Sequence, residues 1–256
     1  MDPNDAVCAV PRLQVMVVLD SDQLTGRSRA HVLELAEPPC TLQPDVARAF
    51  VALRGAAAGA GLDLAAASSF RDFERQLGIW NDKFLGRRPL LDRDGTPLNA
   101  AVMTAPQIVR AILHWSALPG ASRHHWGTEI DVIDRAALTD GRKAQLVPAE
   151  YSADGVFGSL DSWLTRHAES FGFFRPYDRD RGGVQPEPWH LSFAPIAGPA
   201  LQALTVDVLS EALRDVELAG AEAVWPQLDE IHARYVRAIA QPSARALGFS
   251  PESRLS

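Results

Sequence analysis

Two short segments of this chain contain the residue types of a metal-dependent hydrolase. One runs from residue 122 to 131 and reads Ser-Arg-His-His-Trp-Gly-Thr-Glu-Ile-Asp, and the other runs from 187 to 190 and reads Glu-Pro-Trp-His. Together they offer two imidazoles and a carboxylate as ligands, with a second carboxylate beside the last histidine. A catalytic zinc site needs three such ligands, a fourth position for water and a separate base. The two segments therefore predict a catalytic zinc site.

The adjacent histidines His124 and His125 compete for one ligand position. Successive side chains of an extended chain point to opposite sides, so only one of them can face a metal that Asp131 also binds. Gly127 lies between the histidines and the aspartate, and a glycine permits the tight turn that brings a loop histidine over a strand. A surface pair of histidines followed by an ordinary strand is the alternative interpretation of this segment alone.

These segments resemble the paired signatures of the M15 zinc carboxypeptidases, the VanY-type D-alanyl-D-alanine and LD-carboxypeptidases that trim peptidoglycan stems. The first signature, Ser-x-His-x-x-Gly-x-Ala-x-Asp, is matched by Ser122, His124, Gly127 and Asp131. The second signature, Glu-x-Trp-His, is matched by Glu187, Trp189 and His190. A third feature of the family is a Ser-Gly-Tyr-Arg turn with a glutamine five residues after the arginine, and it resembles Ser68-Ser69-Phe70-Arg71 with Gln76. The likeness covers roughly residues 45 to 195.

The resemblance implies a role for each matched residue. One zinc ion per chain would be held by His124, Asp131 and His190. Glu187 would be the general base, and Arg71 would stabilise the polarised carbonyl. Substrate contacts are expected from Ser122, Gln76 and Trp189; the alternatives are a purely structural hydrogen bond for Ser122 and Gln76, and a place in the core for Trp189. His125 would then lie beside the site or face solvent.

Glu129 is the main departure from the family pattern, which has alanine at this position. Side chains alternate along a strand, so Glu129 shares a face with Asp131. Three roles are open for it: a hydrogen bond to a ligand histidine, an effect on the metal-activated water, or repulsion of an acidic substrate group.

The resemblance implies a zinc-dependent carboxypeptidase that removes a terminal D-amino acid, D-alanine, from peptidoglycan stem peptides or muropeptides. Two alternatives stay open: an endopeptidase that cuts inside the stem or crossbridge, and an inactive, zinc-stabilised binding module. The presence of both Glu187 and Arg71 favours an active enzyme. The sequence does not separate DD- from LD-specificity.

Hydrophobic periodicity predicts the elements that position these residues. Helices are expected at 44–61, 71–85, 106–115 and within 156–173, and strands at 62–70, 128–133 and 189–194. Residues 86–99 are expected to form a loop near the site. Glu187 is predicted in a turn before the last strand, because Pro186 and Pro188 cannot join the interior of a sheet.

The predicted fold class is therefore α+β: a small, mainly antiparallel sheet carries the zinc site, helices flank it, and a helical hairpin follows at the C-terminal end. The topology of the sheet comes from the resemblance. Three parts are expected: residues 1–43 as an N-terminal extension packed on the core, 44–196 as the zinc peptidase core, and 197–256 as a C-terminal helical appendage.

Composition limits the partners of the protein. The net charge is −7 and Lys and Arg form no cluster, which argues against a nucleic-acid partner. No run of about twenty apolar residues predicts a membrane span. The N-terminal residues lack the features of a secretory signal, so a cytoplasmic location is expected by default, with a periplasmic or exported one still open. Cys8 and Cys40 are expected to be free thiols, with a single disulfide as the alternative.

Overall fold

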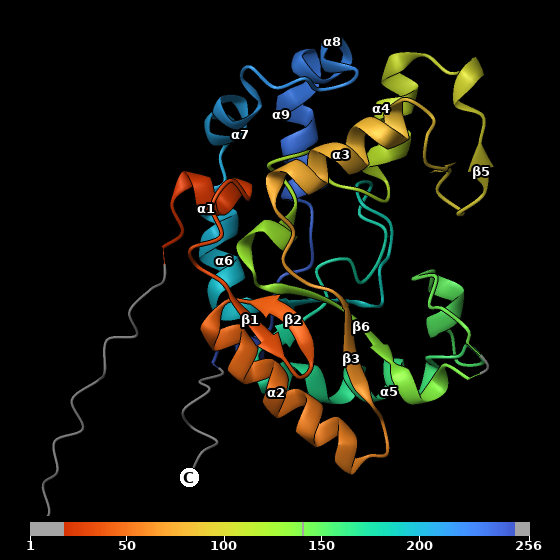
Figure 1. Cartoon of the computed structure of the whole chain (residues 1–256), viewed down its shortest axis with the longest axis vertical. Coiled ribbons are helices and arrows are strands. Elements are labelled where there is room, and N and C mark those ends of the chain that lie inside the picture. Colours follow the sequence, from red (N-terminus) through yellow and green to blue (C-terminus); the bar gives the residue numbers. More distant parts are fainter. Residues whose placement is uncertain (1–17, 140, 249–256) are drawn as a thin grey trace, which may run out of the picture.

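A small antiparallel sheet lies at the centre of the protein, as a computed structural model shows for residues 18–139 and 141–248 (Figure 1). The sheet has four strands in the order β3-β6-β8-β7. These strands are β3 (Leu64–Ser68), β6 (Glu129–Asp134), β8 (His190–Phe193) and β7 (Phe173–Phe174). Every neighbouring pair is antiparallel. The α+β class and the three long strands predicted from the sequence are confirmed.

The two central strands place the predicted ligands side by side. In the register of β6 and β8, Asp131 lies opposite His190 and Glu129 lies opposite Ser192. Side chains that face each other across an antiparallel pair have Cβ atoms about 4.5–5.5 Å apart, within direct reach of one another. The alternation predicted for 128–133 therefore holds: one face of β6 carries acidic residues, while Ile130 and the other apolar side chains enter the core.

One apolar core fills the space between the sheet and the helices α2 (Pro44–Gly59) and α5 (Gly158–His167) (Figure 1). Pro44 lies in the first turn of α2, where the missing N–H leaves no helical hydrogen bond unmade. Phe50 and Leu53 of α2 are completely buried against residues of β6 and β8. This core makes the sheet a rigid platform for the side chains on its other face.

A second apolar core lies on the other side of the molecule, around α3 (Phe73–Phe84) and α4 (Ala105–Leu113). Trp80 of α3 is completely buried there, and its indole N–H donates to the carbonyl of Ala219. The same core contains residues from the helices that follow the sheet, namely α6 (Ala194–Ala203), α7 (Val206–Leu213), α8 (Ala221–Val224) and α9 (Leu228–Ile231). The C-terminal helices are thus integrated with α3 and α4 in one core.

The C-terminal region is helical, as predicted, but it consists of several short helices where two long ones were expected. The first of them, α6, ends at Ala203, and Thr205 caps α7, because its hydroxyl accepts from the backbone N–H of Val208. Asp215 and Gly220 adopt left-handed backbone conformations in the loop before α8. A π-helical turn at His232–Val236 follows α9, and α10 (Ala244–Leu247) is the last described helix.

Short elements complete the fold. Helix α1 (Ser21–Thr25) precedes a hairpin of β1 (Leu33–Ala36) and β2 (Pro39–Leu42). The segment predicted as a loop, 86–99, contains the small hairpin of β4 (Leu90–Leu91) and β5 (Pro97–Leu98). Cys40 is a buried free thiol, while Cys8 lies outside the described residues. None of the described helices has the length and apolar character needed to cross a membrane.

Candidate metal centre

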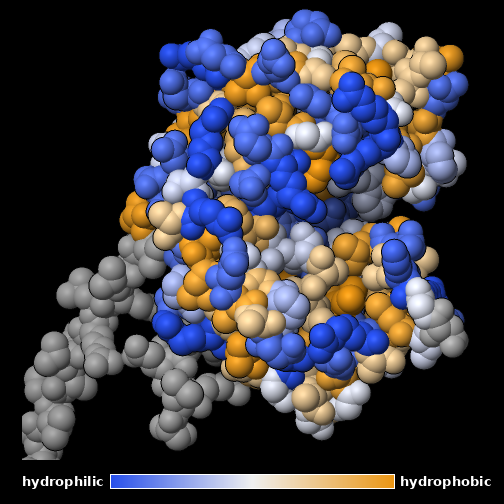
Figure 2. Space-filling model, in the orientation of Figure 1, coloured by the Kyte–Doolittle hydropathy of each residue, from blue (hydrophilic) through white to orange (hydrophobic). Residues whose placement is uncertain are grey.

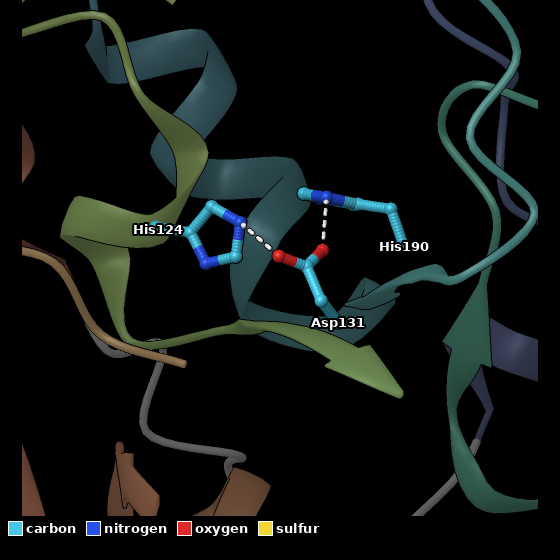
Figure 3. A group of neighbouring side chains, drawn as sticks. All are labelled: His124, Asp131 and His190. Atoms are coloured by element: carbon cyan, nitrogen blue, oxygen red, sulfur yellow. Dashed lines mark ion pairs between the residues drawn. The ribbon is translucent and has the colours of Figure 1, made fainter. Parts of the chain in front are cut away.

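Three side chains from three different elements converge on one point (Figure 3). His124 comes from the 3-10 turn Arg123–Trp126, Asp131 from β6 and His190 from β8. Their ligand atoms all lie within 4.8 Å of one another, and all three residues are buried. His124 Nε2 is 3.4 Å from Asp131 Oδ2, and His190 Nδ1 is 3.1 Å from Asp131 Oδ1. The structure therefore brings together the three residues that were predicted as metal ligands.

Gly127 makes this convergence possible. It ends the 3-10 turn in a left-handed conformation with φ of +67°. A Cβ at this position would collide with the side chain of Val32, so a larger residue would displace the neighbouring chain. The backbone reverses direction here, and this reversal places His124 over the strand that carries Asp131, as the sequence predicted.

The hydrogen bonds of the two histidines define which ring nitrogens face the site. His124 Nδ1 is 2.8 Å from the carbonyl oxygen of Ser69, and His190 Nε2 is 2.7 Å from Oε2 of Glu129. Both of those oxygens only accept, so each of these nitrogens carries a proton. In the neutral rings the opposite nitrogens then carry lone pairs, and these point at Asp131.

This donor set fits a divalent cation. Two nitrogen lone pairs and a carboxylate converge, and a cation between them relieves their mutual repulsion. Among the described residues, the buried Oδ1 of Asp131 has no hydrogen-bond partner besides Nδ1 of His190, which lies 3.1 Å away. Two histidines and one carboxylate are a ligand set of catalytic zinc sites, which use three protein ligands.

The charges around the two histidines differ. Burial lowers the pKa of His124 to about 4, so this ring is neutral near pH 7. Burial also acts to lower the pKa of His190, but the hydrogen bonds and charges of Asp131 and Glu129 outweigh it and raise the pKa to about 10. A proton therefore occupies Nδ1 of His190 unless a metal cation displaces it, as happens when a metal binds to histidine.

Glu187 lies next to this group, in the turn that precedes β8. Its backbone carbonyl accepts from the N–H of His190, and its Oε2 is 3.4 Å from His190 Nδ1. The predicted position before the strand is confirmed. Burial raises the pKa of Glu187 to about 7, although the charges of His190 and Arg71 oppose this shift. A carboxylate with a pKa near neutrality is well suited to accept and return a proton.

Arg71 is held at the edge of the site by its neighbours. Its Nη1 donates to Oε1 of Gln76 at 2.8 Å, and its Nη2 lies 3.3 Å from Oγ of Ser68. Its backbone N–H donates to the carbonyl of His124, and its carbonyl accepts from Nδ1 of His125. These contacts tie the arginine to the turn that carries His124.

His125 faces away from the metal site, so only His124 of the adjacent pair faces the cation position. The ring of His125 is completely buried beside the backbone of Arg71, and its Nε2 accepts from the N–H of Gly120. The solvent-facing alternative for His125 is therefore wrong. This histidine supports the loop that positions Arg71.

A cavity of about 640 Å³ opens over the metal site, between the half of the molecule that contains the sheet and the half that contains α3 and α4. Figure 2 shows the surface indented between these two halves. The cavity is lined by Arg71, His124, Asp131, Glu187 and His190. Leu91 and residues 93–95 of the β4–β5 hairpin form part of its wall, as expected for the segment 86–99.

The predicted substrate-binding residues divide into two groups. Ser122 and Trp189 line the cavity. Gln76 does not line it: its side chain is completely buried, its Oε1 accepts from Arg71, and its Nε2 donates to the carbonyl of Ala117. Both ends of this amide are thus occupied by the protein, and the glutamine holds Arg71 from behind.

Three residues at the site were not predicted from the sequence. The ring of Tyr177 lines the cavity with its centroid 5.1 Å from that of His190. Arg123 and Ser192 each form a hydrogen bond with Glu129, and Arg123 also donates to Ser192; all three residues lie behind His190 as seen from the metal site. Only the strand alternation hints at Ser192, because it places this residue on the same face as His190.

Comparisons with known proteins agree with this site. The family model "VanY: D-alanyl-D-alanine carboxypeptidase" matches residues 39–196. An uncharacterised protein of Haemophilus influenzae is 35% identical over 121 residues, which cover 46% of this chain and 92% of that protein. A D-alanyl-D-alanine carboxypeptidase of Enterococcus faecalis is 26% identical over 136 residues, which cover 51% of this chain and 40% of that enzyme.

Among solved structures, VanYB in complex with D-Alanine-D-Alanine has a TM-score of 0.47 and 21% identity, over 72% of this chain and 89% of that chain. The family model alone spans more than half of the sequence and includes every residue of the converging group. The protein belongs to the VanY family of D-alanyl-D-alanine carboxypeptidases.

Proposed function

We propose that this protein is a zinc-dependent carboxypeptidase that removes a terminal D-alanine from peptidoglycan stem peptides. One observation carries the proposal: two imidazole nitrogens and a carboxylate face one point at the base of a cavity, with Glu187 beside them. Membership of the VanY family supplies the reaction and the substrate class.

In this proposal His124, Asp131 and His190 hold the zinc ion. When bound, zinc polarises the scissile carbonyl and lowers the pKa of a water molecule to about 7. The protein side chains supply the remaining chemistry. The buried acceptors Ser69 O and Glu129 Oε2 hold a proton on the outer nitrogen of each ring, so that the inner nitrogens, His124 Nε2 and His190 Nδ1, would be the ones that bind the metal.

Glu187 acts as the general base. It accepts a proton from the attacking water and transfers it to the nitrogen of the leaving D-alanine as the peptide bond breaks. Glu187 lies in the turn before β8 and is not one of the three ligands His124, Asp131 and His190. Its carboxylate can therefore lie beside the metal position without taking a ligand place.

Arg71 stabilises the negative charge that develops on the carbonyl oxygen. Its guanidinium is always ionised and is held by Gln76, so it needs little reorganisation during the reaction. Replacement by lysine keeps the charge but removes the fork that Gln76 and Ser68 hold. We expect Arg71→Lys to lower kcat by about 10²–10³-fold with zinc still bound, as measured by steady-state kinetics and metal analysis.

The matched control for this substitution is Arg175→Lys. Arg175 is also mostly buried in an ion pair, with Asp161, but it does not line the cavity. This control should keep kcat within a small factor of the wild-type value. A wild-type kcat in Arg71→Lys would contradict the role of Arg71.

The substrate assignment is tested with defined tri-, tetra- and pentapeptide stems. We expect one equivalent of free D-alanine from the pentapeptide, detected by mass spectrometry and by a D-amino-acid oxidase assay. Release from the tetrapeptide instead would assign LD-specificity. Two peptide fragments without free D-alanine would identify an endopeptidase, and no cleavage of any stem by the zinc-loaded protein would reject the proposal.

A further inference from the structure

Glu129 is completely buried at a position where the family signature has alanine. Its Oε2 accepts from His190 Nε2 at 2.7 Å. Its Oε1 accepts from Ser192 Oγ at 2.8 Å and Thr128 Oγ1 at 2.9 Å, and it lies 3.3 Å from Nη2 of Arg123. We propose that Glu129, fixed by Arg123 and Ser192, is a positioning residue that locks His190 in the orientation and tautomer needed for zinc binding. This inference rests on the proposed zinc site.

The hydrogen bonds of this network all run toward Glu129, from Arg123 through Ser192 on one side and from His190 on the other. Arg123 can only donate, and its Nη2 donates to Oγ of Ser192 at 2.7 Å. The hydroxyl of Ser192 accepts that bond and gives its own proton to Oε1 of Glu129. Donors thus saturate Oε1, which orients the carboxylate and leaves Oε2 for the ring of His190.

The strand register explains why Glu129 reaches His190. Glu129 lies opposite Ser192 on β8, and Asp131 lies opposite His190 two residues along. The ring of His190 therefore lies between two carboxylates on one face of the sheet: Nδ1 faces Asp131 and Nε2 faces Glu129. An acceptor on the outer nitrogen of a metal-binding histidine fixes the tautomer and makes the inner nitrogen a better ligand.

A carboxylate suits this position because both of its oxygens face groups that donate: Oε1 lies near Arg123, which cannot accept, and Oε2 accepts from His190. Glu129→Gln keeps the shape but replaces one oxygen by an NH2 group. In one orientation the NH2 group faces Arg123, and two donors then oppose each other. In the other orientation the NH2 group faces Nε2 of His190, which must then accept, so the ring proton moves to Nδ1, the nitrogen that should bind zinc. In either orientation the Nδ1 lone pair of His190 is less well placed to bind zinc.

We expect Glu129→Gln to lower zinc affinity by about 10–100-fold, measured by competition with a chromophoric chelator. Ser192→Ala removes one donor while Arg123 stays, so it should lower the affinity in the same direction by a smaller factor. Asp134→Asn is the matched control. Asp134 is a buried carboxylate of the same strand that accepts from the backbone of Asp63 outside the cavity, and its replacement should leave zinc affinity unchanged.

Proton NMR of the zinc-loaded proteins supplies a second measurement. The Nε2 proton of His190 should resonate far downfield in the wild type, because it is bonded to a carboxylate, and should move upfield in Glu129→Gln. Wild-type zinc affinity in both Glu129→Gln and Ser192→Ala would overturn this inference alone. Failure of the wild-type protein to bind zinc would overturn it together with the proposed function.

Discussion

Glu187→Gln is expected to lower kcat by about 10²–10⁴-fold while the protein still binds one zinc ion per chain. The amide matches the carboxylate in shape, so the turn before β8 and the hydrogen bond from the N–H of His190 to its carbonyl are retained. The amide cannot accept a proton at neutral pH. Turnover therefore loses the group that moves the proton from water to the leaving nitrogen.

The comparison of metal content with turnover separates two roles for Glu187. Its Oε2 lies 3.4 Å from the His190 nitrogen that faces the site, close enough to raise the question of a fourth ligand. A ligand role would predict loss of zinc along with activity, whereas a base role predicts loss of activity alone. Stem-peptide hydrolysis and atomic absorption on the same preparation give both readouts.

Glu169→Gln is a matched control for this experiment. Glu169 is a partly exposed carboxylate in the 3-10 turn Ala168–Phe171, remote from the residues that line the cavity. Its replacement should leave both kcat and zinc content unchanged. Wild-type turnover in Glu187→Gln would remove the general base from the proposed mechanism.

Local signals predicted most of the elements that surround the site. The apolar stripe of Phe73 and Trp80 identifies α3, and the alternation around Ile130 identifies β6. Pro186 and Pro188 exclude Glu187 from the strand and so place it in the turn. Each of these features depends on neighbours in the sequence, which is why the sequence alone reveals them.

Contacts between distant segments could not be predicted in this way. The pairing of Asp131 with His190 joins residues that lie far apart in the chain, and only the resemblance to a family suggested it. Three roles were open for Glu129, and the 2.7 Å contact with His190 supports the first, a hydrogen bond to a ligand histidine. Gln76 carries no local signal that separates a substrate contact from its buried position behind Arg71.

The packing partners of the C-terminal helices could not be predicted from the sequence either. The apolar stripe of α7 and α9 predicts that one side of each helix is covered, but periodicity does not name the partner. The partner is a core shared with α3 and α4, on the side of the cavity opposite the sheet. The metal site therefore lies between two separately packed cores, and both contribute residues to the walls of the cavity.

Zinc is expected to stabilise the wild-type fold strongly, and Asp131→Asn is expected to remove this effect. A ligand at about 1,000 times its Kd stabilises the folded state by about 4 kcal/mol. For a chain of this size, about 1 kcal/mol shifts Tm by roughly 2–4 °C, so zinc should raise Tm by roughly 8–16 °C. Differential scanning fluorimetry with and without zinc measures this shift.

Asparagine at position 131 changes the chemistry of the site without changing its shape. It removes the negative charge that pairs with the protonated Nδ1 of His190 in the metal-free wild type, and it removes the only carboxylate among the three ligands. The metal-free variant should therefore be no more stable than the metal-free wild type, and it should show no zinc-dependent rise in Tm and no hydrolysis of stem peptides. Asp134→Asn on the same strand should keep the full zinc response. A zinc-dependent rise in Tm of wild-type size in Asp131→Asn would show that the cation binds elsewhere, because the carboxylate that lies between the two histidines would then be dispensable.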